Sequence, residues 1–146
     1  MMQINQVDVL AEVTAAFRRY ESALLSNDVG VLNELFWDDE RVVRFGASES
    51  LYGSDAVKRF RSTRPIHDLQ RTLMRTTITT FGKDAATASV EFRRHRSGHY
   101  GRQSQTWIRT AAGWRIVAAH VSHDGVPERN NGSHAPSAVL APGARQ

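Results

Sequence analysis

The chain has 146 residues, of which 40% are hydrophobic, and it contains no cysteine. A chain of this length can bury most of its apolar surface as one domain, and the lack of thiols excludes disulfides, cysteine nucleophiles, zinc–thiolate sites and iron–sulfur clusters. The formal net charge is +4, and the basic excess is arginine, since Lys58 and Lys83 are the only lysines. Arginine suits carboxylates and phosphates, and no nucleic-acid-binding motif accompanies it. We therefore expect a small anionic ligand and no nucleic-acid partner.

Targeting signals and membrane spans are not apparent. The N-terminus lacks a basic segment followed by an apolar run, and no window approaches the roughly 18 apolar residues of a membrane span. These features predict a cytoplasmic protein with no membrane contact. Residues 125–146 are rich in Gly, Pro, Ser, Asn and Ala without periodicity, which predicts a domain over residues 1–124 followed by a flexible tail.

The first half of the chain predicts three helices and a short hairpin. Apolar residues recur at helical spacing over residues 7–26, and Asp28 can cap a short second helix that ends near Phe36. Residues 42–46 form a β-branched strand, and residues 47–52 can pair with it as a hairpin. A third helix begins at residues 53–55 and ends before Pro65.

From residue 71 onward the apolar period changes to two, which predicts strands over residues 71–81, 86–96, 103–111 and 113–122. Helices followed by an antiparallel meander indicate an α+β domain. In the last strand, alternation places His120 on one face with Trp114 and Ile116, and Val117 and Val121 on the other. Both faces are then largely apolar, so we expect the outer sheet face to pack on a second subunit in a homodimer.

Several spaced motifs carry a family resemblance. They are Phe17-x-x-Tyr20, Leu35-Phe36-Trp37, Val43-Arg44-Phe45-Gly46, Leu51-Tyr52-Gly53, Phe60-Arg61-x-x-Arg64, residues 101–107 and the last strand. In this order they resemble the SnoaL-like branch of the NTF2-like superfamily, and within it the AtzH-like and HpxZ-like proteins of urea-derivative and oxalurate catabolism. The resemblance implies an NTF2-like cone, with three N-terminal helices packed on a curved antiparallel sheet around a ligand cavity, and a homodimer.

For the AtzH-like members, the resemblance further implies a decarboxylating amidohydrolase that acts on an N-carboxylated urea such as 1,3-dicarboxyurea and yields allophanate. The family's key tyrosine and arginine fall on Tyr20 and Arg44. The chemistry of these residues agrees, because an arginine can grip a carboxylate and a buried tyrosine can deliver a proton. Arg44 could instead form a structural ion pair with Glu49 or Glu21, and Tyr20 could be a plain core residue.

Further side chains could line the same cavity. The candidates for substrate binding are Phe36, Trp37, Tyr52, Arg61, Arg64, Gln105, Trp107 and His120. Arg64 could equally be exposed before Pro65, and His120 could be a satisfied core residue. Alternation cannot decide whether Gln103 and Gln105 or Ser104 and Thr106 face inward, because the strand register is unknown.

The sequence offers little for other chemistries. We expect no metal site, since His95 and His99 lie near a hairpin tip, and no cofactor, since a glycine-rich phosphate loop is missing. Two other functions stay open: a non-catalytic binding or accessory protein, and an isomerase or cyclase of the NTF2-like kind. The latter needs a carboxylate base, for which Glu49 and Glu91 are the near candidates.

Overall fold

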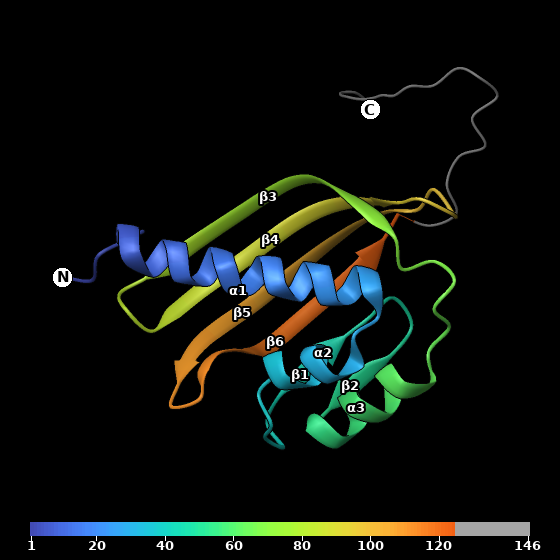
Figure 1. Cartoon of the computed structure of the whole chain (residues 1–146), viewed down its shortest axis with the longest axis horizontal. Coiled ribbons are helices and arrows are strands. Elements are labelled where there is room, and N and C mark those ends of the chain that lie inside the picture. The colour runs from blue at the N-terminus through green and yellow to red at the C-terminus, as the bar shows by residue number, and fades with distance from the viewer. Residues whose placement is uncertain (125–146) are drawn as a thin grey trace.

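The computed structural model describes residues 1–124 and combines three helices with a six-stranded sheet (Figure 1). The elements in chain order are α1 (Val7–Ser26), α2 (Val29–Leu35), β1 (Val43–Phe45), β2 (Ser50–Tyr52), α3 (Ser54–Thr63), β3 (Arg71–Phe81), β4 (Ala85–Arg94), β5 (Tyr100–Thr110) and β6 (Gly113–His123). The α+β prediction is confirmed. The predicted tail, 125–146, lies outside the described residues. None of the described helices has the length and apolar character that a membrane crossing needs.

The sheet has the order β2-β1-β6-β5-β4-β3. The four long strands form an antiparallel meander, and β1 pairs with β2 as the predicted hairpin. The prediction of a wholly antiparallel sheet is wrong at one place, because β1 runs parallel to β6, with Arg44 opposite Ala119. This pairing sets the first short strand beside the last long one, so Arg44 lies on a strand that has neighbours on both sides. The cone shape stays a prediction.

Helix α1 lies across one face of the long strands, while α2 and α3 gather at the end of the sheet that carries β1 and β2 (Figure 1). The buried residues of α1 include Val13, Phe17, Tyr20 and Leu24, which recur at three- and four-residue steps and so form one face. The helix ends at Asn27, whose left-handed backbone lets its N–H reach the carbonyl of Leu24 at 3.1 Å. Tyr20 is thereby fixed on the side that faces the sheet.

Proline sets the end of α3. The residue before a proline is pushed out of the helical region, and Arg64 accordingly has φ −68° and ψ 152°. The helix therefore stops at Thr63, and Arg64 begins the segment that leads to β3. Arg61 lies in the last turn of the helix and is buried.

A β-bulge in β6 changes which residues of this strand face inward. Trp107 pairs with Ile116 and Thr106 pairs with Ala118, so Val117 is the extra residue. Trp114 and Ile116 are buried before the bulge, and Ala119 and Val121 are buried after it. The predicted inward position of His120 is therefore wrong: His120 is exposed, and its ring packs against Phe45 at 5.8 Å.

The same bulge weakens the sequence argument for a covered outer face. After Val117, the outward residues of β6 are Ala118, His120 and Ser122, and His120 pairs across β5 with Ser104. This part of the outer face is more polar than simple alternation predicted. The homodimer stays a prediction.

The cap of α2 gives a test of local stability. The Asp28 carboxylate accepts a hydrogen bond from the N–H of Val31 at 3.1 Å, as predicted from the sequence. We expect Asp28→Ala to lower the free energy of unfolding by about 1 kcal/mol, because it leaves that N–H without its cap. Urea titration measures the change, and Asp28→Asn, which can still cap, is the control. Equal stability of the alanine variant and the wild type would contradict the prediction.

Candidate arginine-lined site

Arg44 points to the inner side of the sheet and is paired. Its side chain is 11% exposed, and its Nη1 donates to Oε2 of Glu49 at 2.7 Å. Burial alone would raise the pKa of Glu49, but the hydrogen bond and charge of Arg44 outweigh burial and lower it. Gly46 permits this pairing, because a Cβ there would overlap the Glu49 carboxylate. The ion-pair alternative considered for Arg44 is therefore present in the structure.

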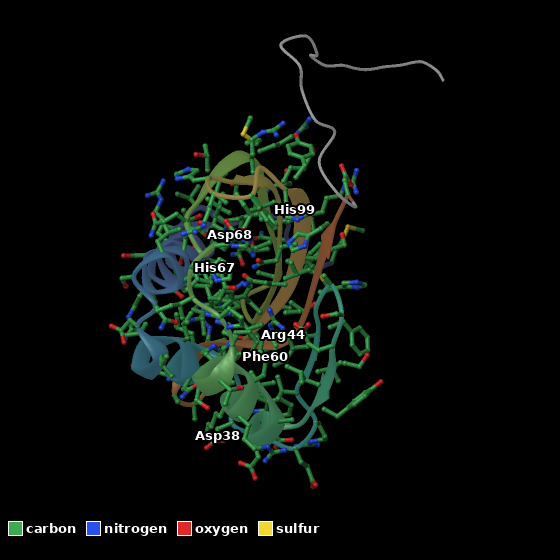
Figure 2. All side chains as sticks on the ribbon, turned by 90° about the vertical axis from the view of Figure 1, so that its right-hand side faces the viewer. Asp38, Arg44, Phe60, His67, Asp68 and His99 are labelled. Atoms are coloured by element: carbon green, nitrogen blue, oxygen red, sulfur yellow. The ribbon has the colours of Figure 1, made fainter. Side chains whose placement is uncertain are left out.

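A cavity of about 260 Å³ opens beside this pair. Its lining comes from the hairpin, the end of α3, the segment before β3 and the ends of β4 and β6, and includes Arg44, Phe60, Arg64, Asp68, Arg94 and His123. Figure 2 shows Arg44 and Phe60 next to each other between α3 and the sheet, with His67 and Asp68 on the segment above them and Asp38 at the opposite end of α3. Segments distant in the sequence thus converge on one positively charged space.

Arg64 carries the least satisfied polar group of this cavity. Its Nε and Nη2 atoms are buried and have no hydrogen-bond partner within residues 1–124. Burial lowers the pKa of Arg64, and the neighbouring charges of Arg44 and Arg71 lower it further. A guanidinium with two buried, unused donors is costly unless an acceptor fills the space in front of it.

Arg61 lies deeper and is partly satisfied. Its Nη1 donates to Oδ1 of Asn33 at 3.0 Å, whereas its Nε is buried without a partner among the described residues. Burial lowers the pKa of Arg61 to about 10, with Arg64 and Arg44 adding repulsion. The group nevertheless stays protonated at neutral pH.

Aromatic rings, more than carboxylates, accompany these cations. The guanidinium carbon lies 4.6 Å from the Phe36 ring centre for Arg61, 4.9 Å from Phe60 for Arg44 and 5.1 Å from Phe92 for Arg94. A ring face stabilises a cation without cancelling its charge. The positive potential of the cavity therefore persists for a ligand.

A hydrogen-bonded relay orients Tyr20. Arg71 donates to the Glu21 carboxylate at 2.6 and 3.0 Å and to Oε1 of Gln103 at 3.0 Å. Because Oε1 is occupied by a donor, the amide Nε2 of Gln103 must face Tyr20, to whose hydroxyl it donates at 3.4 Å. The hydroxyl accepts this bond and keeps its own proton to donate.

The structure resolves the register of β5. Gln103, Gln105 and Trp107 point inward and are buried, while Ser104 is exposed on the other face. The indole Nε1 of Trp107 donates to Oε1 of Gln105 at 3.0 Å, and the Nε2 of Gln105 has no partner in the described part of the chain. Gln103 therefore joins the site through Tyr20, and Gln105 is a second inward amide.

Three predicted binding residues lie away from the arginine cavity. Tyr52 is 66% exposed and packs on Phe45, and His120 is on the outer face. Trp37 stacks with Arg41 and lines a separate groove of about 590 Å³ between α2 and the β5–β6 turn. Phe36 lines that groove as well, although it is buried and lies 6.4 Å from the Tyr20 ring. Arg61, Gln105 and Trp107 are buried but are not among the lining residues of the arginine cavity, so the prediction that one cavity unites all these residues is wrong.

The basic cavity residues that the sequence analysis missed include Arg94 and His123. Arg94 follows the buried Phe92 by two positions on β4, so alternation alone could have placed it inward. His123 faces inward only because of the bulge at Val117, which no sequence pattern reveals. Among residues 1–124, no cluster of His, Asp and Glu side chains could hold a metal ion.

The relay yields a stability test. Gln103→Leu would leave the Nη1 of Arg71 buried without its acceptor, so we expect the free energy of unfolding to fall by about 1–3 kcal/mol. Thermal or urea unfolding measures this loss. Ser104→Ala, the adjacent residue on the exposed face, should change stability by less than about 0.5 kcal/mol. Equal effects of the two substitutions would contradict the relay.

Comparison with known proteins places the chain in a family. A structure of a protein with unknown function from Pectobacterium atrosepticum is 59% identical, with a TM-score of 0.80 over 82% of this chain and 94% of that one. A cystatin-like fold protein from Burkholderia xenovorans is 45% identical, with a TM-score of 0.82 over 87% and 100% of the two chains. An NTF2-like superfamily protein from Salmonella enterica shares the fold at 24% identity, with a TM-score of 0.63 over 88% and 98%.

A search of curated proteins found no match. The family model, in contrast, covers almost all of the described residues. It matches residues 2–125, and the chain therefore belongs to the AtzH-like family.

Proposed function

We propose that this protein is a small-molecule enzyme that binds an N-carboxylated urea or a related ureido acid in the arginine-lined cavity and removes CO2 from it. The observation that carries the proposal is the pair of buried donors on Arg64 that have no partner within residues 1–124. Arg44 and Arg94 line the same space, where Glu49 occupies one donor of Arg44 and aromatic rings stabilise both guanidinium groups without cancelling their charges. A planar guanidinium fork matches a carboxylate, whose two oxygens can accept both free N–H groups of Arg64.

Tyr20 supplies the group that chemistry at such a carboxylate needs. When the C–N bond of an N-carboxylated urea breaks, CO2 departs and the bonding electrons stay on nitrogen, which must then receive a proton. The Tyr20 hydroxyl has a proton to give, because it accepts from Gln103. It also lies near enough to Arg61, Arg64 and Arg94 to interact electrostatically with each, and water would return the proton that Tyr20 gives up.

The isomerase or cyclase alternative has less support. It requires a free carboxylate base, yet Glu49 is bonded to Arg44, and Glu91 accepts from the Tyr100 hydroxyl at 3.2 Å beside outer-face residues. Asp68 lines the cavity but accepts from the N–H of Ser97. The other alternative is a protein that binds carboxylates without turnover. It would use the same anion site as the enzyme and would differ only in that Tyr20 donates no proton.

Binding is tested at Arg64. We expect Arg64→Gln to weaken binding of N-carbamoylglycine by about 10- to 100-fold, because it removes a charged donor pair worth roughly 1.5–3 kcal/mol. Isothermal titration calorimetry gives the affinities. Arg59→Gln removes an exposed arginine from α3, the helix that precedes Arg64, and should leave binding within about twofold. Unchanged affinity in the Arg64 variant would reject the cavity as the anion site.

Turnover is tested at Tyr20. With 1,3-dicarboxyurea carrying ¹³C in its carboxylates, release of labelled CO2 and formation of allophanate can be followed by NMR. Tyr20→Phe should lower kcat at least 100-fold while KM changes little, because it removes a proton donor but no charge. A variant that keeps full kcat would exclude Tyr20 as the donor. Wild-type protein that binds ureido acids but turns none over would favour the binding protein.

A further inference from the structure

His123 is an inward group of the cavity that the chemistry above does not use. It is near the end of β6, and it lines the same cavity as Arg44, Arg64 and Arg94. Its Nε2 atom is buried and has no hydrogen-bond partner among residues 1–124. The ring is held in place from two sides, since it meets Phe92 edge to face at 6.0 Å and stacks on His99 at 5.2 Å. An oriented imidazole thus presents an unused polar atom next to the anion site.

The surroundings determine what this atom can do. Burial lowers the pKa of His123 below its usual 6.5, and the charge of Arg94 lowers it further, so the ring is neutral at pH 7. A neutral imidazole has one N–H and one lone pair. His123 shares the cavity with Arg44, Arg64 and Arg94, and nearby cations favour a tautomer that turns its lone pair toward them. We assign that lone pair to Nε2, the buried atom without a partner among residues 1–124, and an N–H group is the ligand from which it would accept.

We infer that His123 is a specificity-determining residue that accepts a hydrogen bond from an N–H of the ligand, so that the site selects carboxylates bearing a ureido or amide N–H over carboxylates of equal shape without one. This inference rests on the proposed function, because it assumes that Arg64 and Arg44 hold the carboxylate. The arginines cannot make this distinction, since they are donors only. The Glu49 and Asp68 carboxylates of the cavity already accept from Arg44 and from the N–H of Ser97, whereas Nε2 of His123 has no partner within residues 1–124 and can accept from a ureido N–H.

The test compares two ligands of nearly equal shape. N-carbamoylglycine has ureido N–H groups, and 4-oxopentanoate replaces them with carbon. We expect the wild type to bind N-carbamoylglycine about tenfold more tightly by calorimetry at pH 7.5. His123→Phe, which can keep the ring contacts, should reduce this ratio to near one while the affinity for 4-oxopentanoate changes less than about twofold. His123→Gln, whose carbonyl can accept, should restore part of the ratio.

His120→Phe is the matched control, because His120 is on the same strand but exposed on the outer face. It should leave the ratio unchanged. A wild type that binds both ligands equally, or a His123→Phe variant that keeps the ratio, would overturn the inference and leave the anion site standing. If the wild type binds neither ligand, both proposals fail. Far-ultraviolet circular dichroism checks each variant for folding. If His123→Phe does not fold, the affinity ratio of His123→Gln is compared with that of the wild type instead.

Discussion

The structure depends on burying arginines without neutralising them. A guanidinium cannot shed its proton in a protein, so each one taken from water needs acceptors, a counter-charge or a ring face. Here Arg71 receives full compensation from Glu21 and Gln103, Arg44 receives one carboxylate, and Arg64 has two donors without partners within residues 1–124. Compensation by protein groups thus falls along a gradient from Arg71 through Arg44 to Arg64. In the proposed function, the carboxylate of the ligand supplies the acceptors that Arg64 lacks.

The fold explains why this gradient is tolerated. The sheet brings β1 beside β6, and α1 covers the face onto which the inward residues of β5 project (Figure 1). Arg71 at the start of β3 is therefore locked between helix and sheet, and its bonds hold Gln103 and Tyr20 at fixed positions. Groups oriented in advance lose little entropy when a ligand arrives. The hydrogen-bonded residues Arg71, Gln103 and Tyr20 are buried between helix and sheet, and the unpaired donors of Arg64 lie at the cavity.

Local signals were sufficient for most of the fold. Helical spacing, the Asp28 cap, Pro65 and two-residue alternation located all nine elements, and the motifs pointed to Tyr20 and Arg44. The failures concerned long-range contacts: the parallel pairing of β1 with β6 and the bulge at Val117 depend on which strands pair and in which register, and local sequence patterns do not carry that information. The bulge moved His120 outward and His123 inward. The sequence could not decide whether Arg64 lines the cavity or is exposed, because the side chain of a residue before proline can point toward the core or toward solvent.

The structure changes which arginine we expect to be the main contact for an anion. From the sequence this residue is Arg44, because it lies between apolar neighbours on a strand, yet Glu49 already occupies one of its donors. An anion that binds there has to share the guanidinium with that carboxylate, whereas Arg64 faces no such competition. Arg44 then contributes mainly positive potential and the wall beside Phe60, and Arg64 contributes the direct contacts. In the proposed function, Arg64 at the end of α3 therefore contributes more of the binding energy than Arg44 in β1.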